Sequence, residues 1–268
     1  MSEQRKANDG SAENVSLSVN SEIATLTLND PGSRNALSSD VMAKIQNILD
    51  EIKIASDIHV VILQATGPIF CSGHNLKEIM GDSRESQMQI LFRQCSQMMQ
   101  SIVNLPKPVI AKVDGMATAA GTQLVASCDL AFASASSKFA TPGVNLGLFC
   151  STPMVALSRN VSPKHAMEFL LGGEFMDADH AARVGLINRA MPESELDDVV
   201  LGFAQRIASK SPLTVRTGKT AFYQQLTMPL AEAYDYTSQV MSENMQTRDA
   251  QEGISAFLEK RDPKWRGE

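Results

Sequence analysis

Alternating apolar and polar positions near the start of the chain predict a β-hairpin followed by a helix. Residues 15–19 (VSLSV) and 23–28 (IATLTL) alternate, and residues 20–22 join them. Apolar residues then recur at helical spacing, which predicts a helix beginning after Ser38 or Ser39, with an inward face of Val41, Ile45, Ile48, Leu49 and Ile52.

Short continuous apolar runs predict buried strands. They lie at residues 59–63, 109–113 and 130–133, and helices are expected between them over 86–103 and 117–127. This alternation of strand and helix is typical of an α/β fold. Beyond about residue 163 we expect helices with almost no strand, over residues 163–170, 178–184, 195–209, 212–227 and 230–260.

The change of pattern suggests three parts of the chain. Residues 1–14 are charged with both signs, contain no apolar run and are expected to form a mobile tail. Residues 15–200 would form the α/β core, and residues 201–268 a helical C-terminal region.

Composition narrows the function classes. A net charge of −6 disfavours broad binding to nucleic acid or to an anionic membrane. No stretch approaches the roughly 18 apolar residues of a membrane span. The four cysteines show no metal-binding spacing, so we expect reduced thiols and no metal site. The expected location is the cytoplasm, or the mitochondrial matrix if a transit peptide has been removed.

Two segments rich in small residues stand where a strand meets a helix: residues 69–78 (IFCSGHNLKE) and 113–124 (VDGMATAAGTQL). Small side chains let a ligand approach the backbone, and the unpaired N–H groups of a first helical turn favour a negatively charged oxygen. Two such groups aimed at one point would form an oxyanion hole. Tight packing of a strand on a helix produces the same composition, so the residues alone leave both interpretations open.

These segments resemble the two oxyanion-hole signatures of the crotonase (enoyl-CoA hydratase/isomerase) superfamily, in the family's order and about 46 residues apart. The resemblance runs from about residue 15 to 265. It includes further motifs at residues 29–31 with 35–38, 107–111 leading to Gly115, 128–130, 181–188 and 257–261.

The resemblance implies a spiral of ββα units whose C-terminal helices build a homotrimer or homohexamer. The ligand would be a coenzyme A thioester, with no bound cofactor. The backbone N–H groups of His74 and Ala120 would hold the thioester oxygen, with Gly121 as the neighbouring option. By the same resemblance, other residues would contact coenzyme A: Ser33 and Arg34 at the adenosine end, Asn75, Leu76 and Lys77 along the pantetheine and acyl entrance, and Phe257 with Lys260 at a neighbouring subunit.

The chain departs from the family's pattern at the two positions that carry out hydration. The usual hydratase places two carboxylates around one water molecule. Their positions are occupied here by Gln123 and Gly143. Glutamine has no useful pKa and glycine has no side chain, so neither can act as a general acid or base.

Other residues near these positions are weaker candidates for the acid–base role of the two carboxylates. Cys150, Ser151 and Thr152 follow Gly143, but hydroxyl groups need a base beside them. We expect Asp129 to be structural, Glu78 to be a solvated helix charge and His74 to stand at the pocket edge. The other three histidines, His59, His165 and His180, occupy ordinary strand or helix positions.

Three functions therefore remain open. The chain could be an enzyme acting on acyl-CoA by thioester hydrolysis or by a rearrangement that needs only a stabilised enolate. It could instead be a non-catalytic acyl-CoA binder, or an assembly protein with a vestigial pocket. The two N–H-presenting segments favour chemistry, whereas Gln123 and Gly143 favour the binder.

Overall fold

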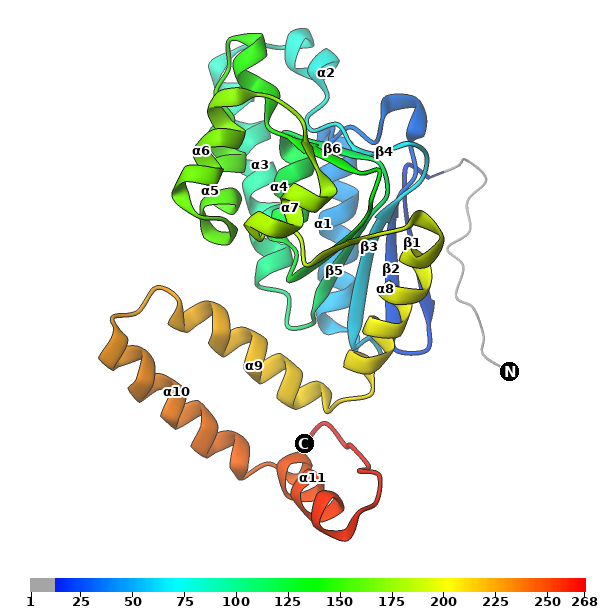
Figure 1. Ribbon diagram of the computed structural model, residues 1–268, viewed down its shortest axis with the longest axis vertical. Helices are drawn as coiled ribbons and strands as arrows, with labels where there is room; N and C mark the ends of the chain where they lie inside the picture. Colours follow the sequence, from blue (N-terminus) through cyan, green and yellow to red (C-terminus); the bar gives the residue numbers. More distant parts are fainter. Residues whose placement is uncertain (1–12) are drawn as a thin grey trace.

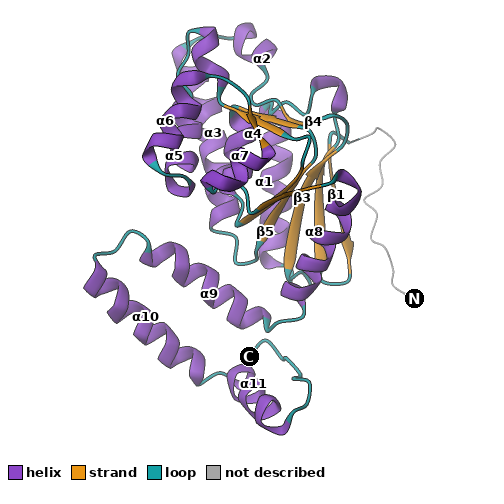
Figure 2. Ribbon diagram, in the orientation of Figure 1, coloured by secondary structure: helices purple, strands orange, loops and turns teal. Residues whose placement is uncertain are grey.

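The computed structural model describes residues 13–268, and its strands form two sheets (Figure 2). The larger sheet has the order β1-β2-β3-β5-β7-β10, with β1 Val15–Asn20, β2 Ile23–Leu28, β3 Val60–Ala65, β5 Val109–Val113, β7 Leu130–Ser134 and β10 Arg189–Met191. The smaller sheet has the order β4-β6-β8-β9, with β4 Ile69–Cys71, β6 Met116–Thr118, β8 Lys138–Ala140 and β9 Met176–Asp177.

The predicted hairpin is confirmed, since β1 pairs antiparallel with β2 in a register that sets Val15 opposite Leu28. From β2 onward the larger sheet is parallel. Each of β3, β5 and β7 is followed by a short strand of the smaller sheet and then by a helix. This repeat is the expected spiral of ββα units, and it brings the ends of β4 and β6 side by side.

Helices surround the sheets and then extend away from them (Figure 1). Their bounds are α1 Ser39–Ile54, α2 Leu76–Gly81, α3 Glu85–Val103, α4 Ala120–Ser127, α5 Ser151–Asn160, α6 Pro163–Gly172, α7 Ala178–Val184, α8 Glu193–Ala208, α9 Pro212–Gln225, α10 Leu230–Met245 and α11 Arg248–Glu259. Two 3-10 turns, η1 Pro31–Ser33 and η2 Pro142–Leu146, complete the elements. No helix within residues 13–268 is long and apolar enough to cross a membrane.

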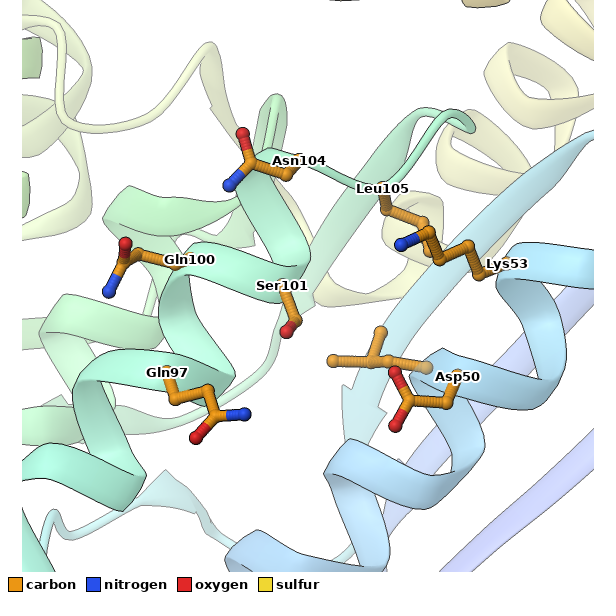
Figure 3. Close-up of a pocket in the computed structure, with 8 residues that line it drawn as sticks. Asp50, Lys53, Gln97, Gln100, Ser101, Asn104 and Leu105 are labelled. Carbon is orange, nitrogen blue, oxygen red and sulfur yellow. The ribbon is translucent and has the colours of Figure 1, made fainter.

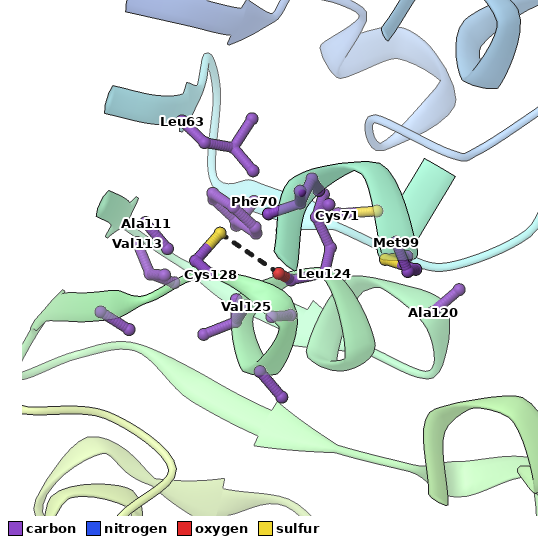
Figure 4. Packing of buried hydrophobic residues seen from close by; sticks show 14 of the residues in the cluster. Leu63, Phe70, Cys71, Met99, Ala111, Val113, Ala120, Leu124, Val125 and Cys128 are labelled. Atoms are coloured by element: carbon purple, nitrogen blue, oxygen red, sulfur yellow. Dashed lines mark hydrogen bonds between the residues drawn. The ribbon is translucent and has the colours of Figure 1, made fainter. Parts of the chain in front are cut away.

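The larger sheet is buried on both faces, which explains its continuous apolar strands. On one face α4 is buried along its whole length, and Leu124 and Val125 pack near Phe70 and Val113 (Figure 4). The Cys128 thiol donates to the Leu124 carbonyl and ends that helix. On the other face, Leu196, Val200 and Ala204 of α8 pack on the sheet in a second buried cluster. The residues from the strands in this cluster include Ile23, Val60, Ile62, Ile110 and Phe132.

Local signals account for several boundaries. The Ser38 hydroxyl accepts from the Val41 amide, so Ser38 is the N-cap of α1 as predicted. The single helix expected over 230–260 is wrong: it is two helices, because the Thr247 hydroxyl accepts from the Ala250 amide and starts α11. The helix expected from Ala117 begins at Ala120, because residues 116–118 pair as β6.

The expected division of the chain into a tail, a core and a C-terminal region can be compared with the structure at α8 and in the helices that follow it. Helix α8 continues across residue 200 and packs on the larger sheet. The division of the chain into a core and a C-terminal region near this residue stays a prediction. Beyond α8, the α9–α10 pair and α11 extend away from the sheets (Figure 1). Residues 1–12 of the expected tail lie outside the described residues.

Helix α9 is attached to the core by a buried ion pair. The Lys219 ammonium lies 2.7 Å from Asp129 Oδ2 and also donates to the carbonyls of Ile102 and Lys107. The Tyr223 hydroxyl donates to Asp129 Oδ1, and the same carboxylate accepts from the Val109 amide. The structural role predicted for Asp129 is thereby confirmed.

We expect Lys219→Met to destabilise the fold by about 3–5 kcal/mol, because it leaves the buried Asp129 carboxylate without its cation. Only 7% of the Lys219 side chain and 15% of the Asp129 side chain are exposed. The matched control is Lys112→Met, whose partner Asp197 is 81% exposed, and it should cost about 0–1 kcal/mol. Urea unfolding measures both variants, and equal losses would contradict the assignment.

Candidate functional site

The two small-residue segments meet in the structure. A Cβ atom on Gly121 would lie 2.1 Å from the Cys71 carbonyl oxygen, so only glycine lets α4 approach β4 this closely. A Cβ atom on Gly73, where φ is +89°, would lie 2.9 Å from the Ala119 Cβ and 3.2 Å from the Ala120 nitrogen. The Ala120 amide is therefore held directly beside the residue that precedes His74.

The backbone at His74 is oriented by a short parallel bridge. The Leu37 amide donates to the Gly73 carbonyl at 2.8 Å, and the Asn75 amide donates to the Leu37 carbonyl at 3.1 Å. Because backbone groups alternate along an extended chain, the intervening His74 N–H points away from Leu37. Within the described residues it has no backbone acceptor.

The first turn of α4 also presents amide groups. Its N-cap is Ala119, which has φ 51° and offers no side-chain acceptor, while the Ala119 amide itself donates to the Ala140 carbonyl. The leading N–H groups of a helix have no acceptor within the helix, so those of Ala120 and Gly121 remain available. Two segments that pack against each other at Gly73 thus each carry N–H groups without a backbone acceptor among the described residues.

The His74 imidazole is sheltered and uncharged. It meets the Phe92 ring edge-on, with ring centroids 5.1 Å apart. Burial lowers the pKa of His74 to about 4, against the opposing pull of the Glu78 carboxylate. Its Nε2 atom is buried and lacks a hydrogen-bond partner among residues 13–268.

Gln123 is the second side chain with an unpaired buried atom. It is buried on α4, and its Oε1 finds no partner in the described part of the chain. Gln123 stands one turn after Ala120, and helical side chains lean toward the N-terminus. Its amide therefore leans toward the end of α4 that presents the free N–H groups.

At Gly143 there is no space for a larger residue. A Cβ atom there would lie 2.8 Å from Cys150 Sγ and 3.0 Å from the Leu148 carbonyl oxygen. Burial raises the pKa of the Cys150 thiol, so it is not poised as a nucleophile. The Ser151 hydroxyl donates to the Phe149 carbonyl rather than to a base.

Most of the other predicted contact residues adjoin this place. The Arg34 carbonyl, just after Ser33 in η1, accepts from the Ser72 amide at 3.1 Å, which joins the predicted adenosine-side turn to the His74 segment. Asn75 is the N-cap of α2, and its Oδ1 accepts from the Lys77 and Glu78 amides. Leu76 and Lys77 are exposed beside it.

Phe257 and Lys260 lie elsewhere. They end α11, at the far end of the molecule from α2 (Figure 1). Phe257 is 82% exposed. A single chain does not bring them to the candidate site, so a role beside a neighbouring subunit stays a prediction.

Some contacts were not foreseen from the sequence. Glu78, expected to be only solvated, also accepts from the Ser39 amide at 3.0 Å and so joins α2 to the start of α1. Phe92 is distant in sequence from His74, and no spacing signal could have paired the two rings. Cys150 follows Gly143 closely in sequence, but only the fold shows that its Sγ lies against that glycine.

A hollow of about 230 Å³ between α1 and α3 contains none of the predicted site residues (Figure 3). Its lining includes Asp50, Lys53, Gln97 and Gln100. It opens near the C-terminal ends of both helices, whereas the candidate site lies near their N-terminal halves at Ser39 and Phe92. We assign it no role.

The low pKa of His74 predicts a pH-dependent loss of stability. Between pH 6.5 and about 4 the unfolded chain takes up a proton at this residue and the folded chain does not, so the free energy of unfolding falls as pH falls through that window. The full effect is about 3 kcal/mol. His74→Gln should remove this component from unfolding curves, and a ring titration by NMR giving a pKa near 6.5 would contradict it.

Comparison with known proteins identifies the family of the chain. The family described as enoyl-CoA hydratase/isomerase matches residues 18–268. The human mitochondrial protein named enoyl-CoA hydratase domain-containing protein 3 is 48% identical over 243 residues, which cover 91% of this chain and 80% of that protein. Residues 120–129 and 139–153 resemble this animal branch in particular. A probable enoyl-CoA hydratase of Bacillus subtilis is 30% identical over 95% of this chain and 99% of its own length.

Solved structures show the same fold. The crystal structure of the human domain-containing protein 3 has a TM-score of 0.92 and 46% identity, and the comparison covers 94% of this chain and all of that one. An enoyl-CoA hydratase of Mycobacterium smegmatis gives a TM-score of 0.93 at 43% identity, covering 94% of this chain and 99% of that one. The chain therefore belongs to the enoyl-CoA hydratase/isomerase family, the crotonase superfamily.

Proposed function

We propose that this protein binds acyl-CoA thioesters, with the thioester oxygen held by the backbone N–H groups of His74 and Ala120. The observation that supports this most directly is the close packing of Gly73 against Ala119 and Ala120, which brings together the two segments that carry these amides. Preorganised amide donors stabilise negative charge on a carbonyl oxygen, and the first turn of α4 adds its dipole. Gly121 is the neighbouring donor.

The rest of the ligand would extend along the adjoining loops. Ser33 and Arg34 would contact the adenosine end of coenzyme A, and Asn75, Leu76 and Lys77 the pantetheine and acyl entrance. Because the Asn75 side chain already caps α2, its part would be to orient the backbone. The thioester is the substrate or ligand, and no resident cofactor is required.

Ordinary hydration is not the reaction that these residues serve. The amide of Gln123 cannot exchange protons, and Gly143 has no side chain. The imidazole of His74 is uncharged and weakly basic. Reactions that need only a stabilised enolate or tetrahedral oxyanion, such as slow thioester hydrolysis or a rearrangement, remain within reach of the backbone donors.

The second candidate is a non-catalytic acyl-CoA binder. Cys150 Sγ lies against Gly143, where the family's second carboxylate would emerge, so the site keeps its donors and blocks one place for an acid or base. Turnover of any member of a panel of acyl-CoAs separates the candidates, whereas crotonyl-CoA hydration tests the premise that they share. We expect hydration to be at least about a hundredfold to ten-thousandfold below that of a conventional hydratase, since two positioned proton-transfer groups are absent. An ordinary hydratase rate would contradict both candidates.

Assembly as a homotrimer or homohexamer is part of the proposal. Helices α9, α10 and α11 carry exposed apolar side chains that a partner subunit would cover, including Phe222, Leu226, Leu230, Tyr234, Phe257 and Leu258. In such an assembly Phe257 and Lys260 would reach a neighbour's coenzyme A. The cytoplasm, or the mitochondrial matrix after processing, remains the proposed compartment.

Calorimetry with acetyl-, crotonyl- and long-chain acyl-CoA should detect binding. The sharpest ligand pair is butyryl-CoA and S-butyl-CoA, a thioether without the carbonyl oxygen. Losing an acceptor for two amides should weaken binding by about tenfold or more, since each hydrogen bond contributes roughly 0.5–1.5 kcal/mol. No binding of any acyl-CoA at millimolar concentration would overturn the proposal. Equal affinities for butyryl-CoA and S-butyl-CoA would show that the two amides do not bind the thioester oxygen.

Protein variants test the same donors. Ala120→Pro removes the N–H at the first position of α4, where proline is tolerated, and should cost about 2.7–4 kcal/mol of oxyanion stabilisation. Gln123→Ala removes only a neutral amide and should cost about 0.5–1.5 kcal/mol. Circular dichroism must show that both variants are folded. If folded Ala120→Pro keeps full affinity and turnover while Gln123→Ala loses them, the functional group is the Gln123 side-chain amide and not the Ala120 N–H.

A further inference from the structure

Two histidines and a glutamate lie together on the surface, away from the candidate site. His165 and Glu168 belong to α6, and His180 belongs to α7. One ligand atom from each of the three lies within 4.8 Å of the others. The His165 and His180 rings are perpendicular, with centroids 6.1 Å apart. In the sequence these histidines occupy ordinary helix positions, and only the fold brings them together.

The two helices that carry the cluster are held firmly. Helix α6 is anchored by the buried side chains of Ala166, Phe169 and Leu170, and α7 by those of Ala178 and Ala181. The Asp177 carboxylate caps α7 by accepting from the His180 amide at 2.7 Å. The backbone under each of the three side chains is therefore fixed, and only side-chain rotation is needed to change their separation.

The spacing suits one small ion. His165 and Glu168 are three residues apart and so share a face of α6. His165 Nδ1 lies 3.3 Å from Glu168 Oε2, and two ligands bound at about 2.0–2.1 Å around a tetrahedral ion are separated by about 3.3 Å. A movement of no more than about 1.5 Å by the His180 ring, from within 4.8 Å to the tetrahedral spacing, would close the set. The three side chains are partly exposed, so an ion can reach them.

The ligand types select a class of ion. Two imidazole nitrogens with one carboxylate oxygen suit zinc and its neighbours among the divalent transition metals. Magnesium and calcium prefer sets of oxygen ligands. Three protein ligands leave a fourth position for water.

We propose that His165, Glu168 and His180 form a binding site for one zinc-class divalent ion, which ties α6 to α7. None of these residues belongs to the proposed acyl-CoA site, so the inference does not depend on that function. Helix α6 also holds η2, because Thr141 donates to the Phe169 carbonyl and Asn145 to the Gly173 carbonyl. An ion at this place would stabilise the folded chain by binding it in preference to the unfolded chain.

The test is titration of the metal-free full chain with ZnCl₂, followed by calorimetry and by thermal unfolding. We expect one equivalent of Zn²⁺ to bind and to raise the unfolding temperature, and Mg²⁺ at the same concentration to do neither. His180→Ala should weaken Zn²⁺ binding at least about tenfold, the lower end of the range found when a metal's supporting contacts are lost. Glu168→Gln should weaken it less. His59→Ala, a histidine on the other side of the fold beside the Ala208 carbonyl, is the matched control and should bind as the wild type does.

Cobalt(II) distinguishes this site from the buried cysteines. A tetrahedral site with nitrogen and oxygen ligands gives visible Co²⁺ bands without the strong near-ultraviolet thiolate absorption, and we expect that spectrum in the wild type and its loss in His180→Ala. The proposal is overturned if the wild type binds no Zn²⁺ at a concentration of about 0.1 mM. It is also overturned if folded His180→Ala and Glu168→Gln bind as tightly as the wild type, or if the spectrum shows thiolate ligands.

Discussion

The close approach of two backbones at Gly73 and Gly121 is the constraint on which the candidate site depends. Any Cβ at Gly121 would collide with the Cys71 carbonyl, and one at Gly73 would crowd Ala119. The contact aligns the end of β4 with the start of α4, and the Leu37 bridge then sets the direction of the His74 amide. Ala119 holds a positive φ at this junction, a conformation that costs energy and is kept only where the surroundings enforce it.

The surrounding fold maintains this contact from three sides. Helix α4 is buried throughout, so it cannot tilt away without exposing apolar side chains. Helix α3 covers the site with Phe92, and the Glu78 carboxylate links α2 to α1. Farther away, the Asp129–Lys219 pair attaches α9, the first of the C-terminal helices, which carry exposed apolar side chains.

The proposed site combines backbone donors with two positions, Gln123 and Gly143, that cannot transfer protons. Backbone amides do not depend on side-chain identity, so a change from glutamate to glutamine or glycine can leave the proposed oxyanion hole intact. Among residues 13–268, the buried side-chain atoms that lack a hydrogen-bond partner include Gln123 Oε1 and His74 Nε2. Buried polar groups usually find partners, which makes these two natural contacts for a bound ligand or an ordered water molecule.

The sequence by itself determined the hairpin, the buried parallel strands, the Ser38 cap and the family, because periodicity and turn chemistry are local and the motifs stand in fixed order. It also identified the two small-residue segments, but it could not distinguish tight packing from an oxyanion hole. Only the tertiary structure decided that Gly73 and Ala120 adjoin, that Cys150 lies against Gly143 and that His180 approaches His165 and Glu168. The distances in these contacts are set by how strands, helices and loops pack, which no local pattern of residues encodes.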